Sequence, residues 1–208
     1  MNHPQPPFRT SQQKQEDRAA KRHAVLRAAV QMFNERGFHA TSLDDVAAAL
    51  GISKPTIYHY LGNKDQVLLE CVTIGLQQLL EAAAAAREQP GSGADRLRSF
   101  LRRYGEVTMD DFGRCIVRTS EEALSPESVR RFRALKREID DAMRSLIEEG
   151  IADGSVSPCD PKLLAFTLAG ALNWPARWHD PSGPQSAQEI ASCLVSILSS
   201  GFTPRKDA

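Results

Sequence analysis

Apolar residues recur along this chain at helical spacing, and no segment shows the clear alternation of a strand. The first predicted helix, residues 12–36, places its apolar side chains at positions i, i+3, i+4 and i+7: Leu26, Ala29, Val30 and Phe33. The same spacing predicts further helices over residues 42–50, 63–86, 95–110, 113–124, 125–149 and 186–200. Two more are predicted: a short helix that begins after Ser53, and a helix that begins after Asp160 and runs through the segment LLAFTLAGALNWPARW. With about nine helices, the sequence predicts an all-α protein.

Residues that favour helix N-termini stand before most of these segments. Some are followed by a proline in the first turn or by Gln or Glu at capping-box spacing. The predicted caps are Ser42, Ser53, Asn63, Ser125, Asp160 and Ser186. Gly37, Gly51 and Gly150 are predicted to end helices. The segment EQPGSGAD at residues 88–95 is the clearest break in the chain.

Charge is balanced overall and biased locally. The 208 residues carry 26 basic and 26 acidic side chains, yet residues 1–36 hold seven basic residues against three acidic ones. The opening MNHPQPPFRTSQQ has no apolar run, and we expect no segment to supply the roughly 18 apolar residues of a membrane span. The sequence therefore predicts a cytoplasmic protein with a basic N-terminal end and no membrane partner.

Residues 42–61 have the pattern of a helix-turn-helix. The glycine of the turn, Gly51, stands six residues before Ile57, as expected when the second helix packs across the first. The residues predicted to be buried in this corner are Leu43, Val46, Ala47, Leu50, Ile52, Ile57 and Leu61. At 100° per residue, Pro55, Thr56 and His59 then project away from the core, with Lys54 and Tyr58 on the flank.

This exposed set suits the major groove of DNA, where Thr and Lys reach base edges and Tyr and His reach phosphates. Two consecutive acids, Asp44 and Asp45, would repel phosphates, and we expect them to serve the helix N-terminus beside them. On geometry alone, a corner of two helices with a solvated polar face remains open as the alternative.

The stretch FNERGFHATSLDDVAAALGISKPTIYHYLGNKDQVLLE closely resembles the DNA-binding domain of the TetR family of transcriptional regulators. The resemblance covers about residues 20–70 and includes the Ser-Lys-x-Thr-x-Tyr core and the Asn-Lys-Asp segment. It implies a double-stranded DNA operator as partner. It also implies that eight residues lie at or near the DNA: Thr41, Ser42, Lys54, Pro55, Thr56, Tyr58, His59 and Lys64.

The resemblance also implies the domain organisation. We expect a flexible arm at residues 1–13, a three-helix DNA-binding domain at 14–62, and a domain at 63–208 that binds a small-molecule effector and forms a homodimer. The helix from residue 63 links the two. The apolar face of 187–200 and the small residues Ala169, Gly170 and Ala171 suit a four-helix dimer interface. The alternative is that both helices bury these faces within one subunit.

Candidate pocket residues are aromatic or polar side chains on the predicted helices of the second domain. They are Tyr104, Phe112, Cys115, Arg118, Asn173, Trp174 and Trp178. Side chains of these types are more often part of the core than ligand contacts. The segment GALNWPARWHDPSGP is similar to TetR-type regulators of fatty-acid, steroid or aromatic-acid degradation, whose effectors are often acyl-CoA thioesters. That similarity implies an acyl-CoA or a related intermediate as effector.

Two further classes were weighed. An enzyme is not favoured, because the chain has no GxSxG, HExxH, GxxxxGK[ST] or GxGxxG motif, and we predict no catalytic residue, metal or cofactor. The four cysteines, Cys71, Cys115, Cys159 and Cys193, form no CxxC pair and favour free thiols. A repressor that senses oxidants through a cysteine such as Cys115 remains the alternative to a reversible effector.

Overall fold

The computed structural model describes residues 11–202, and within this range it contains α-helices, two 3₁₀ helices and no strand, so the all-α prediction is confirmed. The α-helices are α1 Ser11–Arg36, α2 Leu43–Ala49, α3 Lys54–Leu61, α4 Lys64–Arg87, α5 Gly93–Met109, α6 Asp111–Arg118, α7 Pro126–Ala152, α8 Pro161–Asn173 and α9 Ala187–Phe202. The 3₁₀ helices are η1 Glu121–Ala123 and η2 Trp174–Arg177. Of the predicted arm, residues 11–13 belong to α1, and residues 1–10 lie outside the described residues.

The predicted helix starts are confirmed by their capping hydrogen bonds. The side chains of Ser42, Ser53, Asn63, Ser125 and Asp160 each accept a backbone N–H from the first turn of the following helix. The Ser186 hydroxyl oxygen likewise accepts the Glu189 N–H at 3.2 Å. These bonds satisfy N–H groups that have no partner within the helix, which is why short polar residues mark these positions.

Several predicted helix boundaries were wrong. The helix expected after Asp160 through residue 178 is α8, which ends at Asn173, and η2 follows it. The helix expected from residue 95 is α5, which begins at Gly93. The helix expected over 113–124 is α6, which ends at Arg118 because Thr119 is extended, and η1 follows it. The helix expected to end at Gly150 is α7, which continues to Ala152. A Cβ on Gly150 would lie 2.5 Å from a methyl carbon of Val156, so Gly150 is needed for close packing. The glycine with a positive φ after α7 is Gly154.

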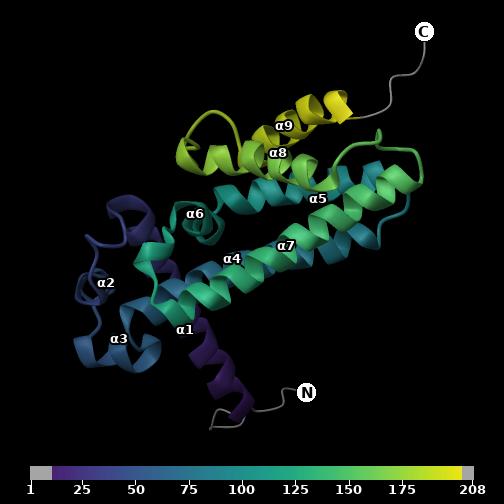
Figure 1. The fold of residues 1–208 in the computed structure, drawn as a ribbon. Helices are drawn as coiled ribbons and strands as arrows, with labels where there is room; N and C mark the ends of the chain where they lie inside the picture. The colour runs from purple at the N-terminus through teal and green to yellow at the C-terminus, as the bar shows by residue number, and fades with distance from the viewer. Residues whose placement is uncertain (1–10, 203–208) are drawn as a thin grey trace, which may run out of the picture.

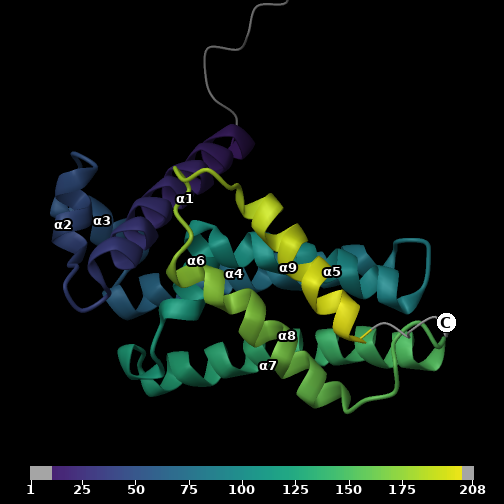
Figure 2. The same cartoon turned by 90° about the horizontal axis from the view of Figure 1, so that it is seen from above.

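The helices form an N-terminal cluster, α1 to α3, at one end of a bundle made by α4 to α9 (Figure 1). In the bundle α4, α5 and α7 pack against one another, and α8 and α9 cross over α5 and α7 (Figure 2). Helix α4 begins next to α3 and continues into the centre of the bundle. It therefore belongs to the packing of both parts.

Helix α4 also corrects one expectation. A window of 18 residues in Lys64–Arg87 reaches a mean hydropathy of 1.4, which is apolar enough for a membrane span by length and composition. Half of that window is buried inside the fold. The apolar side chains of α4 contact α5, α6 and α7, so the composition of this helix is explained by its central place in the core.

Candidate DNA-binding surface and effector pocket

The corner between α2 and α3 is closed by apolar packing. Five of the seven residues predicted to be buried there are buried: Leu43, Val46, Ala47, Ile57 and Leu61. The prediction was wrong for Leu50, which is 37% exposed beside the turn, and Ile52 is only partly buried. Gly51 in the turn has φ 65°, a conformation that side chains rarely adopt. The two helices therefore hold α3 in a fixed orientation, with its remaining residues on the surface.

The exposed face of α3 is the one that the sequence predicted. Lys54, Pro55 and His59 are exposed, Tyr58 is half-exposed, and Thr56 is partly exposed. The Thr56 hydroxyl lies 2.7 Å from that of Ser53, the N-cap of α3. The face thus offers an ammonium, hydroxyls, an imidazole and a phenol to a macromolecule.

The two acids at the start of α2 have different partners. The Lys54 ammonium donates to Asp44 at 2.6 Å, and this bond raises the pKa of Lys54, which stays charged. Asp45 forms a capping box with Ser42, and the hydrogen bonds from Ser42 lower the pKa of Asp45. The expectation that both acids serve the α2 N-terminus therefore describes Asp45, whereas Asp44 pairs with Lys54 of α3.

Thr41 and Lys64 are placed differently from the other residues expected at DNA. Thr41 is 1% exposed, and its hydroxyl donates to the carbonyl oxygens of Met32 at 3.3 Å and Gly37 at 3.0 Å. Its side chain stabilises the end of α1 and is not available to a phosphate, which corrects the expectation for this residue. Lys64 is partly exposed, and its ammonium lies 4.1 Å from the centre of the Phe38 ring.

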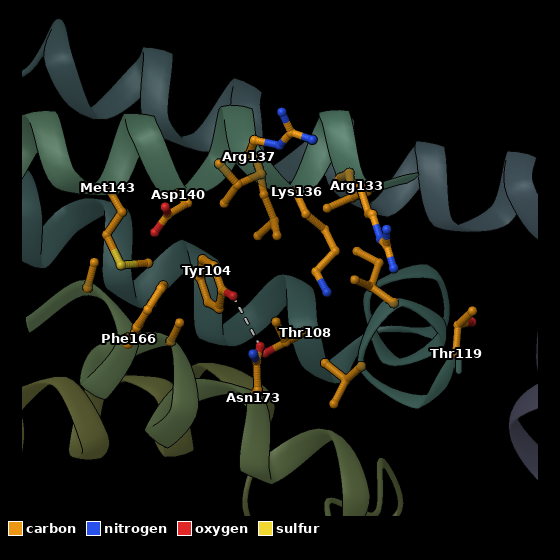
Figure 3. A pocket seen from close by; sticks show the side chains of 17 residues that line it. Tyr104, Thr108, Thr119, Arg133, Lys136, Arg137, Asp140, Met143, Phe166 and Asn173 are labelled. Carbon is orange, nitrogen blue, oxygen red and sulfur yellow. Dashed lines mark hydrogen bonds between the residues drawn. The ribbon is translucent and has the colours of Figure 1, made fainter. Parts of the chain in front are cut away.

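A cavity of about 530 Å³ lies within the bundle (Figure 3). Its lining comes from five helices, and α7 supplies more of it than any other element. The apolar lining residues are Leu76, Leu79, Ile116, Val117, Ile139, Met143, Ala165, Phe166 and Ala169. This size and lining are typical of pockets for small organic molecules.

A polar pair lies on one wall of the cavity. The Tyr104 hydroxyl donates to the Asn173 side-chain oxygen at 3.1 Å, shown as a dashed line in Figure 3. Burial raises the pKa of Tyr104 to about 12, so the phenol is neutral at physiological pH. The bond leaves the amide N–H groups of Asn173 to face a ligand, and such a donor suits a carbonyl oxygen.

Three basic side chains and one acidic side chain, Asp140, which pairs with Arg144, lie along the α7 edge of the cavity. Arg133, Lys136 and Arg137 follow one another along it, and the Lys136 side chain extends toward the Tyr104–Asn173 pair in Figure 3. Arg133 pairs with Glu121 of η1, with guanidinium nitrogens 2.5 and 3.0 Å from one carboxylate oxygen. The charge on this edge favours an anionic group on the ligand.

Only two of the seven pocket candidates from the sequence, Tyr104 and Asn173, line this cavity. Phe112 and Cys115 are buried in the core. Arg118 donates to the Asn34 carbonyl oxygen at 2.6 Å, so it links α6 to α1. Trp174 and Trp178 are 63% and 50% exposed and lie outside the cavity.

The cavity residues of α7 were missed by sequence reasoning. Arg133, Lys136 and Arg137 resemble the charged, solvated face of a surface helix. The available signal was their spacing, because Lys136, Ile139 and Met143 share one face at i, i+3 and i+7. That face combines a cation with apolar side chains, as expected at the edge of a pocket.

The thiols of the core are not activated. Burial raises the pKa of Cys115 to about 11 and raises that of Cys71 well above its ordinary value. Both are therefore protonated thiols at neutral pH, the less nucleophilic form. Within residues 11–202, no three His, Cys, Asp or Glu side chains form a group that could hold a metal ion.

A helix-turn-helix with an exposed second helix, joined to a helical bundle that encloses a pocket, defines a ligand-responsive transcriptional regulator. Two family models match the chain: bacterial regulatory proteins of the tetR family over residues 25–71, and the tetracyclin repressor-like C-terminal domain over residues 90–202. The protein belongs to the TetR family of transcriptional regulators.

Individual relatives agree with this assignment. The chain is 25% identical over 197 residues to the HTH-type transcriptional repressor KstR2 of Mycolicibacterium smegmatis, a match covering 89% of this chain and 92% of the relative. The structure of the ketosteroid transcriptional regulator KstR2 of Mycobacterium tuberculosis is similar with a TM-score of 0.81 at 22% identity, covering 89% and 96%. AibR in complex with isovaleryl coenzyme A and operator DNA has a TM-score of 0.74 at 24% identity, covering 85% and 96%.

Proposed function

We propose that the protein is a cytoplasmic repressor, without catalytic activity, that binds a palindromic operator as a homodimer and is released by an acyl-CoA or a related acid-degradation intermediate. The observation that carries the effector part is the cavity of about 530 Å³, which combines apolar walls with the cationic α7 edge. An acyl chain requires the first feature, and the phosphates of coenzyme A require the second.

The DNA part of the proposal rests on the exposed face of α3. Lys54 and Thr56 lie in its first turn, where they would reach base edges, and Tyr58 and His59 would contact phosphates. Ser42, Pro55 and Lys64 would lie beside the same strands. The backbone N–H groups at the start of α4 would assist Lys64 at a phosphate.

The effector would enter with its acyl group between α4, α7 and α8. Leu76, Leu79 and Met143 would contact the acyl chain, and the Asn173 amide would donate to the thioester carbonyl oxygen. Lys136 and Arg137 would pair with phosphates at the edge. KstR2 is a transcriptional repressor and the AibR complex contains isovaleryl coenzyme A, which supports this class of effector.

Dimer formation is supported by the outer faces of α8 and α9. Leu163 of α8 and Ile197 of α9 are exposed apolar side chains on neighbouring helices. Of the small residues expected at the interface, Gly170 is open to the outside, since a Cβ added there would meet no atom within 4 Å, whereas Ala169 lines the cavity. Exposed apolar side chains of this kind are typical of a surface that binds a second copy of the chain. A symmetric dimer would present two α3 helices to a palindromic operator.

We infer that effector binding moves α4, which joins the bundle to the helix-turn-helix, and so changes the separation of the two α3 helices. A coupling free energy of about 1 to 3 kcal/mol would change operator affinity by about 5- to 150-fold. The redox alternative finds less support, because Cys115 is buried and its pKa is raised to about 11.

The experiment that tests the proposal is selection of bound sequences from random DNA at fixed salt. The wild type is compared with the Thr56→Ala, His59→Ala double variant and with Gln77→Ala, an exposed position on α4 outside the α3 face. We expect a palindromic motif from the wild type and from Gln77→Ala that the double variant loses. If the double variant selects the same motif, the α3 assignment is wrong.

The effector is tested on the selected operator. Isovaleryl-CoA and octanoyl-CoA are added to the protein–operator complex, with free coenzyme A as the control for phosphate binding alone. We expect the acyl thioesters to lower operator affinity at least about 5-fold, within the usual range of allosteric coupling. If free coenzyme A and the thioesters both leave affinity unchanged, the effector class is wrong.

A further inference from the structure

The structure places the pocket wall and a second connection to the DNA-binding helices on the same helix. We infer that α7 transmits the state of the pocket to the recognition helix through Asp65, which Ser125 and Ser128 hold at the N-terminus of α7. We call these three residues the Asp65 cluster. The inference rests on the proposed function and adds a route that enters α4 at its N-terminal turn, next to α3, and does not run along the length of α4 from the cavity.

The Asp65 cluster is a three-donor contact between distant parts of the chain. The backbone N–H and the hydroxyl of Ser125 donate to Asp65 at 2.7 and 3.0 Å, and the buried hydroxyl of Ser128 donates at 2.7 Å. Partial burial works against ionisation of Asp65, but these bonds keep its pKa below the ordinary value. The carboxylate is therefore charged, and a charged acceptor at a helix N-terminus is favourable.

Asp65 follows α3 closely in the sequence. Gly62 is the C-cap of α3, Asn63 is the N-cap of α4, and Asp65 lies in the first turn of α4. A displacement of Asp65 therefore acts on the short connection that sets the angle between α3 and α4. Only Gly62, Asn63 and Lys64 lie between the end of α3 at Leu61 and Asp65.

The other part of α7 forms the pocket wall. Lys136, Ile139, Asp140 and Met143 line the cavity, and α7 continues without a break from Pro126 to Ala152. A ligand that displaces this wall also moves the N-terminus of α7, because one continuous helix transmits displacement along its axis. The Asp65 cluster passes that motion to α4.

Arg133 would connect the anionic end of a ligand with the segment that leads into the Asp65 cluster. Its guanidinium pairs with Glu121 of η1, and η1 ends only two residues before Ser125. A phosphate near the cavity edge would compete with Glu121 for Arg133. Release of Glu121 would loosen the segment that leads into the Asp65 cluster.

The test is a double-mutant cycle that needs no ligand. Ala169→Trp places a large side chain in the cavity from α8, opposite α7. Asp65→Ala removes the contact between α4 and the N-terminus of α7. Asp95→Ala is the matched control. Asp95 also accepts from a serine N-cap, Ser92, but within the start of its own helix. Operator affinity is measured by fluorescence anisotropy, and amide hydrogen exchange of residues 54–70 is measured without DNA.

We expect Ala169→Trp to lower operator affinity about tenfold in the wild-type and Asp95→Ala backgrounds, and less than about twofold with Asp65→Ala. Hydrogen exchange of residues 54–70 should rise in the first two backgrounds and stay unchanged in the third. Asp65→Asn, which removes the charge and keeps the shape, replaces Asp65→Ala if circular dichroism shows that the alanine variant is unfolded.

Equal effects of Ala169→Trp in all backgrounds would overturn the inference, because the signal would then travel through α4 or α6. Absence of any effect in the wild-type background would overturn it as well. The proposed effector is tested separately by calorimetric titration of isovaleryl-CoA and octanoyl-CoA without DNA. Failure of both thioesters to bind rejects the effector class and leaves the outcome of the cycle unaffected.

Discussion

The hydroxyl of Thr41 bonds two carbonyl oxygens at the end of α1, and this contact fixes the chain where it enters the helix-turn-helix. Thr41→Val keeps the shape of the side chain and removes the donor. We expect the free energy of unfolding to fall by about 1 kcal/mol, the usual size of one such bond. Denaturant titration measures this loss. Operator affinity at a temperature where the variant is folded should stay within twofold of the wild type; a larger loss would restore Thr41 as a DNA contact.

Cys115 offers a second prediction at the scale of one residue. Because burial raises its pKa to about 11, we expect native Cys115 to react with a thiol reagent at least about 100-fold more slowly than exposed Cys159 at neutral pH. Mass spectrometry of alkylated peptides over time measures both rates. Rapid modification of Cys115 together with loss of operator binding would favour the redox alternative.

The starts of α2 to α9 each depend on a side chain that satisfies N–H groups of the first turn. The α7 start also has a partner from a distant part of the chain, since both its own Ser125 and the Asp65 carboxylate from α4 interact with it. The same few atoms therefore begin one helix and connect it to another. Loss of this contact affects the position of α7 as well as its stability.

The charge of Asp65 predicts how stability depends on pH. Its folded-state pKa is below the ordinary value of 3.8, so its contribution is complete above that value and is lost as pH falls below it. We expect Asp65→Asn to lose less free energy of unfolding than the wild type between about pH 5 and about pH 3. Denaturant titrations at both pH values measure the difference. If both proteins lose the same free energy of unfolding over this pH range, the pKa of Asp65 is not lowered in the folded protein.

For the whole molecule, the exposed apolar residues of α8 and α9 predict a dimer. Ile197→Asp would place an unpaired charge in that interface at a cost of about 3 kcal/mol, which raises the dimer dissociation constant about 100-fold. Sedimentation velocity over a concentration series measures the change, with Leu50→Asp, an exposed apolar position on the helix-turn-helix side, as the control. A wild-type monomer at all concentrations would contradict the proposal.

Local patterns in the sequence determined where most helices begin and, apart from Leu50 and Ile52, which residues of the helix-turn-helix are buried. A cap such as Ser53 or Asn63 acts on N–H groups within three residues of itself, so its effect can be seen in the adjacent sequence. Ile57 and Leu61 are likewise one turn apart on one short helix. The family resemblance added which exposed residues to expect at DNA.

Only the tertiary structure decided which side chains share the pocket. Lys136 of α7 and Asn173 of α8 line the same cavity, although 37 positions separate them in the chain (173 minus 136). Trp174, one residue after Asn173, points to the surface because the chain passes into η2 at that residue. The Asp65 cluster joins residues about 60 positions apart. Helical periodicity gives the face of one helix, whereas the partner of that face depends on how the helices pack.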